Sequence, residues 1–317
     1  MEAELAEQIK RWASELGFLA CGITSADGIH PSEQTHLTQW LEAGYHGEMQ
    51  YMEKNIDLRV QPSLLVPGAQ SVICLAYNYF PNPSSTEIPT DLPPINSLKV
   101  ARYAWGEDYH RVVKDKVHLL MQRIADRAPN FQGRAFTDSA PVMERQLAQR
   151  AGLGWIGKNS LLLRKGTGSY FFLAEIICNI SFPQDQPILT DHCGTCTACM
   201  DACPTQAIVQ AQVVDSNRCI SYQTIEKNSP SSLSVEQHQG WVYGCDICQE
   251  VCPWNRFAEP NEEPRFSPKN YAHADNSQWQ HWTTHPNEFQ ALLKSTAAER
   301  TGHEKILLEA QRLLGNP

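Results

Sequence analysis

Residues 193–204 have the sequence CGTCTACMDACP. Two residues separate Cys193 from Cys196 and Cys196 from Cys199, and Cys203 follows after three more, directly before a proline. Loops this short turn successive thiolate sulfurs toward one centre, and proline ends such a loop without needing a hydrogen-bond partner. The stretch therefore predicts a module held together by metal or by disulfides.

The remaining cysteines and the start of the chain distinguish these two possibilities. Eight of the eleven cysteines lie between residues 193 and 252. The first residues, MEAELAEQIKRW, lack the basic and apolar segments of a secretion signal, and no run approaches the roughly 20 apolar residues of a membrane span. We therefore expect a cytoplasmic protein without a membrane segment, whose thiols stay reduced and bind metal. Zinc also binds C-x2-C pairs, but it takes only four ligands, so the pattern favours iron–sulfur clusters.

A second, more widely spaced group of cysteines follows the first. Cys219 precedes Cys245, Cys248 and Cys252, and a proline again follows the last of them. The C-x2-C-x2-C-x3-C-P run resembles that of bacterial ferredoxins with two [4Fe–4S] clusters, in which the fourth cysteine ligates the other cluster. The resemblance implies one cluster on Cys193, Cys196, Cys199 and Cys252, and another on Cys203, Cys219, Cys245 and Cys248.

The chain around this module mixes helices and strands. Apolar spacing predicts helices at residues 4–16 and 109–127, composition predicts a strand at 71–80, and segments 160–163 and 169–180 are expected to form a hairpin. Because no strict strand–helix–strand repeat is present, we expect an α+β fold. The expected organisation is an α+β domain over residues 1–180, a ferredoxin-like double-cluster domain over 181–255, and a short C-terminal helical segment over 256–317. Cys21, Cys74 and Cys178 lie in apolar segments and are predicted to be packing residues.

Two local features near the middle of the chain each have two interpretations. A strand at residues 133–137 is predicted to end at Asp138, before a helix at 141–151. Asp138 is thus either a site residue at a strand end or the N-cap of that helix. The loop 152–159, GLGWIGKN, either lets the backbone approach a flat cofactor or is an ordinary tight turn.

Five motifs together resemble one family. They are RYAWGEDYH at 102–110, TDSAPVMER at 137–145, GWIGKNS at 154–160, YGCDICQ at 243–249 and CPWN at 252–255. In this order, and over residues 1–255, the chain resembles the epoxyqueuosine reductases, which complete the queuosine modification of tRNA.

This resemblance implies a cobalamin-dependent reductase with two [4Fe–4S] clusters. In such an enzyme an aspartate, here Asp138, supplies a proton while the epoxide at the tRNA wobble position becomes an alkene. The matching motifs place five further residues near cobalamin: Arg59, Tyr103, Asn159, Ser221 and Asp246. The implied partners are tRNA carrying epoxyqueuosine and a low-potential electron donor, and we expect a monomer. The alternatives are a related reductase acting on a small molecule and a ferredoxin-like electron carrier.

The charge distribution bears on tRNA binding. The net charge is −9, yet residues 99–127 and 134–170 are basic, at +3 and +4. Five basic residues there are candidates to bind phosphates, although any of them can instead be a solvated or structural charge: Arg145, Arg150, Lys158, Arg164 and Lys165. Members of the family commonly continue into a basic helical-repeat segment, so we expect fewer C-terminal tRNA contacts from a chain that ends at residue 317.

Overall fold

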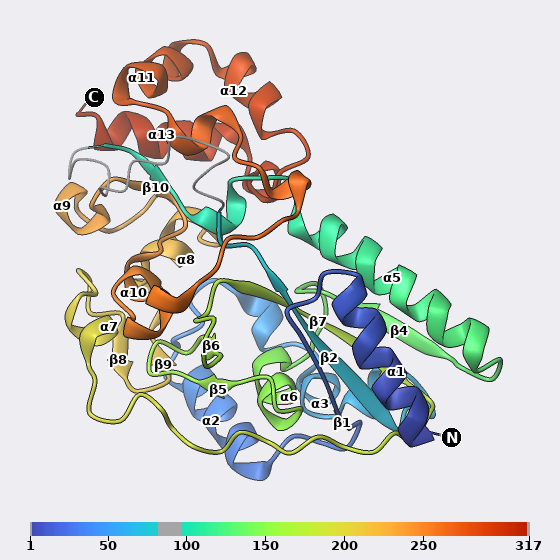
Figure 1. The fold of residues 1–317 in the computed structure, drawn as a ribbon. Helices are drawn as coiled ribbons and strands as arrows, with labels where there is room; N and C mark the ends of the chain where they lie inside the picture. The colour runs from blue at the N-terminus through green and yellow to red at the C-terminus, as the bar shows by residue number, and fades with distance from the viewer. Residues whose placement is uncertain (1, 82–96, 316–317) are drawn as a thin grey trace.

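A four-stranded antiparallel sheet forms the centre of the N-terminal half. The structure is a computed structural model that describes residues 2–81 and 97–315. The strands run in the order β1–β2–β7–β4 (Figure 1), and every neighbouring pair is antiparallel. In that order they span Ala20–Ser25, Ser71–Asn78, Phe171–Cys178 and Gly133–Phe136. Together with its helices, this sheet confirms the predicted α+β fold class.

Helices cover both faces of this sheet. The helical elements of this half are α1 (Glu2–Glu15), α2 (Pro31–Glu42), η1 (Gln50–Met52), α3 (Ile56–Val60), α4 (Pro62–Leu65), η3 (Arg102–Ala104), α5 (Tyr109–Arg127) and α6 (Glu144–Arg150). Helices α1 and α5 pack against each other and against one face, whereas α6 contacts β1, β2 and β7 from the other. Asp108 accepts a hydrogen bond from the His110 N–H and so begins α5, at the position that the spacing predicts.

Apolar side chains alternate along the central strands. On β2, Ile73 and Leu75 belong to the core beneath α1 and α5, whereas Val72 and Cys74 belong to the core beneath α6. Successive side chains of a strand point to opposite faces, so a strand buried on both sides needs an apolar run without polar gaps. The single acidic residue in β7, Glu175, is therefore conspicuous, because it is fully buried.

Two local predictions are wrong. Strand β6 (Leu162–Leu163) pairs with β5 (Trp155–Ile156) and not with β7, which pairs with β2 along its whole length and with β4 over residues 175–178. Helix α6 begins at Glu144 rather than at residue 141, because residues 138–143 form the loop that follows β4.

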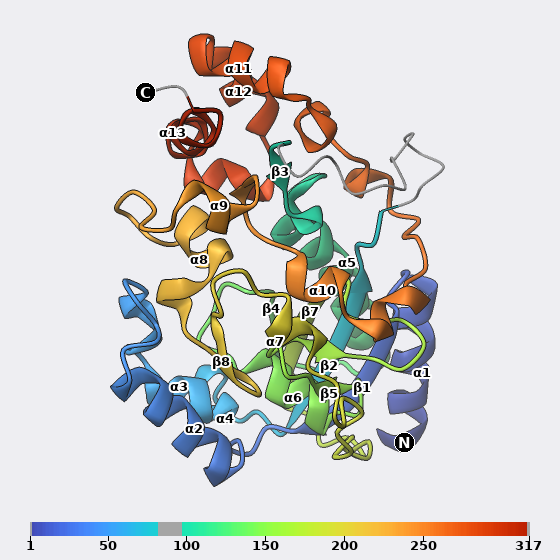
Figure 2. The same cartoon turned by 90° about the vertical axis from the view of Figure 1, so that its left-hand side faces the viewer.

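The cysteine-rich segment consists of short elements joined by tight turns. They are α7 (Ala198–Asp201), β8 (Ile208–Gln210), β9 (Val213–Val214), η4 (Ser216–Arg218), α8 (Ile220–Ile225), α9 (Val235–His238), β10 (Trp241–Tyr243), α10 (Ile247–Glu250) and η5 (Pro253–Phe257). Strand β10 pairs in parallel with β3 (Lys99–Val100), so this segment shares a sheet with the N-terminal half. Figure 2 shows α8 and α10 between the main sheet and the C-terminal helices.

The C-terminal segment is helical, as expected. Its elements are η6 (Pro264–Phe266), η7 (Asn270–His273), α11 (Asn276–Thr284), α12 (Pro286–Leu293), η8 (Ala297–Thr301) and α13 (His303–Leu313). One buried apolar cluster contains Ile9 of α1, Val113 of α5, Val242 of β10 and Ile306 of α13. The three predicted segments thus share a core, and the boundaries at residues 180 and 255 stay predictions.

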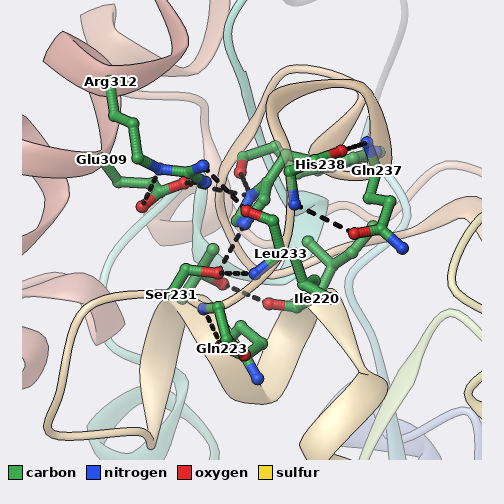
Figure 3. A network of polar contacts seen from close by, with 12 residues as sticks. Ile220, Gln223, Ser231, Leu233, Gln237, His238, Glu309 and Arg312 are labelled. Atoms are coloured by element: carbon green, nitrogen blue, oxygen red, sulfur yellow. Dashed lines mark hydrogen bonds and ion pairs between the residues drawn. The ribbon is translucent and has the colours of Figure 1, made fainter.

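Helix α13 is joined to the cysteine-rich segment by a buried polar network (Figure 3). The fully buried His238 places Nδ1 3.2 Å from Glu309 Oε1, and its Nε2 lies 2.8 Å from Ser231 Oγ. Arg312 bonds the Glu309 carboxylate and donates to the Leu233 carbonyl at 2.8 Å. These contacts attach the C-terminal helix to the segment before β10.

The part of the chain that the structure describes contains no helix long and apolar enough to cross a membrane.

Candidate active site and cluster pockets

A large cavity lies where the three predicted segments meet. Its volume is about 820 Å³, which is within the range of small-molecule and cofactor sites. Its walls come from α2 and α3, the loop after β4, residues 156–160, the β8–β9 hairpin, Glu226 and Arg300. Segments that are distant in sequence therefore build one site.

Three of the predicted site residues line this cavity, and three do not. Asp138, Arg59 and Asn159 are part of its wall. Outside that wall, the Tyr103 ring lies 6.0 Å from each of the Tyr109 and Tyr243 rings, Asp246 is buried beside Arg102, and Ser221 is on α8.

Asp138 follows the last residue of β4 by two positions, and it lines the cavity. Its backbone is left-handed, at φ 51°, a conformation that L residues rarely adopt. Its Oδ2 accepts a hydrogen bond from the Tyr109 hydroxyl and lies 3.7 Å from His110 Nε2. The N-cap alternative is wrong, because Met143 occupies that position of α6 and Asp138 precedes it by five residues.

The partners of Asp138 are themselves held in place. The Tyr109 ring stacks on Phe172 at 4.0 Å and 2°, and His110 Nδ1 lies 2.7 Å from an Asp108 oxygen. Burial and the neighbouring Asp138 carboxylate raise the pKa of Tyr109 well above its usual value, so its hydroxyl remains a donor. Because 59% of the Asp138 side chain is exposed, the protein alone does not keep water away from this carboxyl group.

Two glutamates behind Asp138 were not predicted as site residues. Glu144 Oε1 accepts a hydrogen bond from the Asp138 N–H at 2.8 Å, and the Glu144 side chain lines the cavity. Burial, with the Asp138 charge, raises the pKa of Glu144 to about 8, and burial raises that of Glu175 well above its usual value. The sequence signal was present, since Glu175 is a lone acid within the apolar run FFLAEIIC.

The cavity wall has donors without partners, as expected for a polar ligand site. Arg59 Nε and Ser160 Oγ are buried, and neither has a hydrogen-bond partner among the described residues. Both residues line the cavity, and buried polar groups rarely lack a partner in a complete structure. The volume and these donors fit a large polar cofactor such as cobalamin.

A second cavity, of about 230 Å³, is formed by one predicted set of cysteines. Cys193, Cys196, Cys199 and Cys252 line it, together with Trp254. Burial raises the pKa of the Cys252 thiol, and the nearby Cys193 and Cys196 thiols raise it further. The sulfur-rich lining fits an iron–sulfur cluster, whose ligands are thiolates.

The second predicted set lies next to the first. Burial raises the pKa of the Cys248 thiol, and Cys219 and Cys203 are among the thiols that raise it further. The Ala207 N–H donates to Cys203 Sγ at 3.2 Å, the kind of bond that stabilises cluster sulfur. Asn159 connects the two sites, because it lines both cavities and its Nδ2 donates to the Cys248 carbonyl at 3.2 Å.

Comparison with known proteins agrees with this arrangement. Residues 59–139 match a family model described as epoxyqueuosine reductase QueG, DUF1730, and residues 192–255 match a 4Fe-4S double cluster binding domain. An epoxyqueuosine reductase of Cyclobacterium marinum is 46% identical over 297 residues, which are 93% of this chain and 92% of that protein. The chain belongs to the epoxyqueuosine reductase family. The match to the double cluster domain also decides against zinc.

Solved epoxyqueuosine reductases have the same fold. One, in complex with an epoxyqueuosine-modified tRNA-Tyr stem loop, is 30% identical with a TM-score of 0.87, over 99% of this chain and 81% of that one. Another, from Bacillus subtilis, has an aspartate-bearing catalytic loop swung out of its active site, and it superimposes with a TM-score of 0.86 at 30% identity over 99% of this chain and 82% of that one.

The glycines of the 152–159 loop have a structural explanation in this member of the family. A Cβ on Gly154 would lie 2.1 Å from the Leu163 carbonyl oxygen, and one on Gly157 would lie 2.5 Å from a Leu163 methyl carbon. Gly154 must be glycine because the backbone of β6 packs closely on it, whereas at Gly157 the Leu163 side chain would have to move; this packing favours the tight-turn interpretation.

Internal contacts also occupy most of the basic residues considered for tRNA binding. Arg150 donates to Thr24 and to backbone carbonyls around residues 25–28. Lys158 donates to the Gly194 and Cys196 carbonyls, and Arg164 to the Leu153 carbonyl. Arg145 donates to the Ser160 carbonyl at the cavity wall, and Lys165 is exposed. Arg150, Lys158 and Arg164 are therefore structural charges that hold parts of the chain together.

Proposed function

We propose that this protein reduces epoxyqueuosine to queuosine at the wobble position of tRNA, using cobalamin and two [4Fe–4S] clusters. The observation that supports this most directly is the Asp138 carboxylate on the wall of the large cavity, which Asn159 connects to the cysteine-lined pocket. Membership of the family gives the reaction, and this geometry gives the residues.

The chain offers distinct positions for each group. Arg59, Asn159 and Ser160 would hold cobalamin in the large cavity. The clusters would be held by Cys193, Cys196, Cys199 and Cys252, and by Cys203, Cys219, Cys245 and Cys248. When bound, cobalamin supplies the two electrons for cleavage of the epoxide carbon–oxygen bonds, replenished one at a time through the clusters.

Asp138 would act as the general acid of the reaction. Cleavage of an epoxide leaves negative charge on its oxygen, and a positioned carboxylic acid neutralises that charge by donating a proton. The Tyr109 hydroxyl fixes the orientation of Asp138 Oδ2 by its hydrogen bond, and His110 Nε2 lies 3.7 Å from the same oxygen. Binding of cofactor and tRNA would displace bulk water from around this exposed carboxyl group.

The substrate would enter through the cavity mouth. Tyr51, 51% exposed, and the cations Arg145 and Arg300 belong to its lining. An exposed ring is suited to stack on an unpaired base of an anticodon loop, and the cations to bind its phosphates. We further propose a monomer that acts in the cytoplasm and receives electrons from a low-potential donor.

Reconstitution tests these assignments. The protein, supplied anaerobically with iron, sulfide and cobalamin, is expected to retain a corrinoid absorption spectrum after gel filtration. It is expected to convert tRNA that carries epoxyqueuosine, with an affinity that falls steeply as salt rises. Unmodified tRNA is the matched control for binding. Retention of clusters without corrinoid would instead favour an electron carrier, and corrinoid without conversion of the tRNA would favour a small-molecule substrate.

A further inference from the structure

The buried acid on β7 lacks any ordinary partner. Glu175 is fully buried, and in the sheet it lies between Cys74 of β2 and Phe136 of β4. Within residues 2–81 and 97–315, no N–H or hydroxyl donor reaches either carboxylate oxygen. An ionised carboxylate in such a place would be strongly unfavourable, because nothing replaces the hydrogen bonds that it made with water.

One carboxyl group does lie next to Glu175 on this face of the sheet. The Glu144 side chain at the start of α6 pairs with Glu175, on the face of the sheet that α6 covers. Two carboxylates have no hydrogen to share, so this contact requires a proton between them. The pair therefore holds at least one proton while it stays intact, and it titrates as a unit.

The groups around the pair do not neutralise it. Asp138 and Arg145 act on Glu144 with opposite charge, and the other ionisable groups that face the pair are Cys74, Tyr109 and Arg59. Arg145 donates to the Ser160 carbonyl, and Arg59 donates to the Tyr51 carbonyl at 3.3 Å. A shared proton thus remains the means of accommodating both acids.

The stoichiometry of the proposed reaction requires more protons than Asp138 provides. Conversion of an epoxide to an alkene breaks two carbon–oxygen bonds, consumes two electrons and releases the oxygen as water, which takes two protons. A single carboxyl group donates one and must be protonated again before it donates another. The second proton needs a source beside Asp138.

We propose that the Glu144–Glu175 pair is that source, holding a proton next to Asp138 and returning it to the Asp138 carboxylate through a single water held between the Asp138 and Glu144 side chains after cofactor and tRNA have displaced the bulk water. This inference rests on the proposed function. Glu144 is also a positioning residue, because its Oε1 holds the Asp138 N–H at 2.8 Å. Solvent would restore the proton between turnovers.

Two variants that replace a carboxyl group by an amide distinguish loss of the stored proton from a change in the shape of the site. In Glu175→Gln the new amide N–H donates to the Glu144 carboxylate, so Glu144 releases its proton at lower pH. We expect turnover about 10-fold lower than wild type near pH 8 and recovery to near wild type on acidification. In Glu144→Gln the amide oxygen still accepts the Asp138 N–H but donates no acidic proton. We expect kcat about 10-fold lower at every pH, with KM for tRNA unchanged.

The matched control is Glu15→Gln, whose exposed side chain pairs with Arg123 on the outer surface. It should follow the wild-type pH profile. If Glu175→Gln also followed that profile, or if Glu144→Gln raised KM and left kcat unchanged, the proposal would be overturned.

Infrared spectroscopy tests the stored proton without any substrate. The cluster-containing protein should show, at neutral pH, a carbonyl stretching band of a protonated carboxyl group that disappears at alkaline pH. Glu175→Gln should lack this band at neutral pH, and Glu15→Gln should keep it. If the wild type and Glu175→Gln gave the same spectrum, the pair would hold no proton and the proposal would fail. An inactive wild type with the band present would instead contradict the proposed function.

Discussion

The Asp138 carboxyl group and its backbone are held by two side chains from other parts of the chain, Tyr109 and Glu144. A short β-strand followed by TDS indicated an acid at the end of a strand, and the structure places it there. Its orientation depends on the Tyr109 hydroxyl and the Glu144 carboxylate, which lie 29 residues before it and 6 after it. Such side-chain contacts leave no periodic pattern in the sequence, so the acid was predictable and its partners were not.

Replacing Asp138 by Asn should abolish most turnover while the cofactors remain bound. Asparagine still accepts the Tyr109 hydrogen bond but cannot donate an acidic proton. We therefore expect the rate to fall by about 100-fold or more. Single-turnover conversion of epoxyqueuosine tRNA measures the rate, and the absorption spectrum measures bound corrinoid. A rate within a few-fold of wild type would exclude Asp138 as the proton donor.

The pair Arg102–Asp246 is expected to contribute to stability. Asp246 Oδ2 accepts hydrogen bonds from the Arg102 backbone at 2.8 Å and its guanidinium at 3.2 Å, with only 3% of the Asp246 side chain exposed. Burial raises the pKa of Asp246 to about 6 although Arg102 opposes the rise. Arg102→Met leaves a buried carboxylate without its cation and should cost about 3–5 kcal/mol.

Asp246→Asn is the matched variant, because its amide oxygen still accepts both bonds, and it should cost less. Urea denaturation gives the two free energies of unfolding. If Arg102→Met and Asp246→Asn lowered the free energy of unfolding equally, Arg102 would not stabilise the fold by compensating the charge of Asp246.

At the level of secondary structure, the sequence predicted which helices and strands form better than it predicted which strands pair. The helix at 109–127 and the strand at 71–80 were predicted within two residues, because their apolar patterns reflect burial directly. The pairing of β6 and the start of α6 were wrong, because strand partners and loop paths depend on contacts made across the chain. The double-cluster domain was predicted from cysteine spacing alone, because the ligands of a cluster lie close together in the chain, whereas the assignment of each cysteine to one cluster stays a prediction.

Cys252→Ala tests the predicted crossing of the two cysteine groups. The Cys252 side chain lines the 230 Å³ pocket together with Cys193, Cys196 and Cys199. Its loss should therefore damage the cluster bound there and leave the cluster of Cys203, Cys219, Cys245 and Cys248 intact. Iron content with Mössbauer or EPR spectra distinguishes the two clusters, and selective loss of the second would contradict the crossing.

The attachment of α13 should depend on pH. Burial lowers the pKa of His238 below 6.5, although Glu309 opposes the shift, so the folded state keeps this ring neutral. As pH falls below 6.5, the unfolded chain binds a proton that the folded chain resists, and the free energy of unfolding should decrease. His238→Gln should show a weaker decrease between about pH 7.5 and about pH 5.5 in urea titrations. His281→Gln, at an exposed position of α11, is the control, and a decrease as large in His238→Gln as in wild type would refute this contribution.

At the level of the whole molecule, the site exists only because distant segments converge. The wall of the large cavity extends from Glu33 to Arg300, and one apolar core extends from Ala6 to Ala310. The C-terminal segment, expected to be a short tail, thus contributes both a cavity residue and part of the core. No local pattern could predict that contribution, because it arises from tertiary packing of α13 against β10 and α8.

The most direct test of the account is the fate of the nucleoside in tRNA. Protein containing both clusters and cobalamin, with a low-potential reductant, is incubated with tRNA that carries epoxyqueuosine, and the nucleosides are then analysed by mass spectrometry. Protein without cobalamin is the control, and an anticodon stem loop in place of whole tRNA measures how much of the tRNA is needed. We predict loss of one oxygen atom to give queuosine, only when cobalamin is present. Unchanged epoxyqueuosine, despite bound corrinoid and intact clusters, would contradict the assigned function.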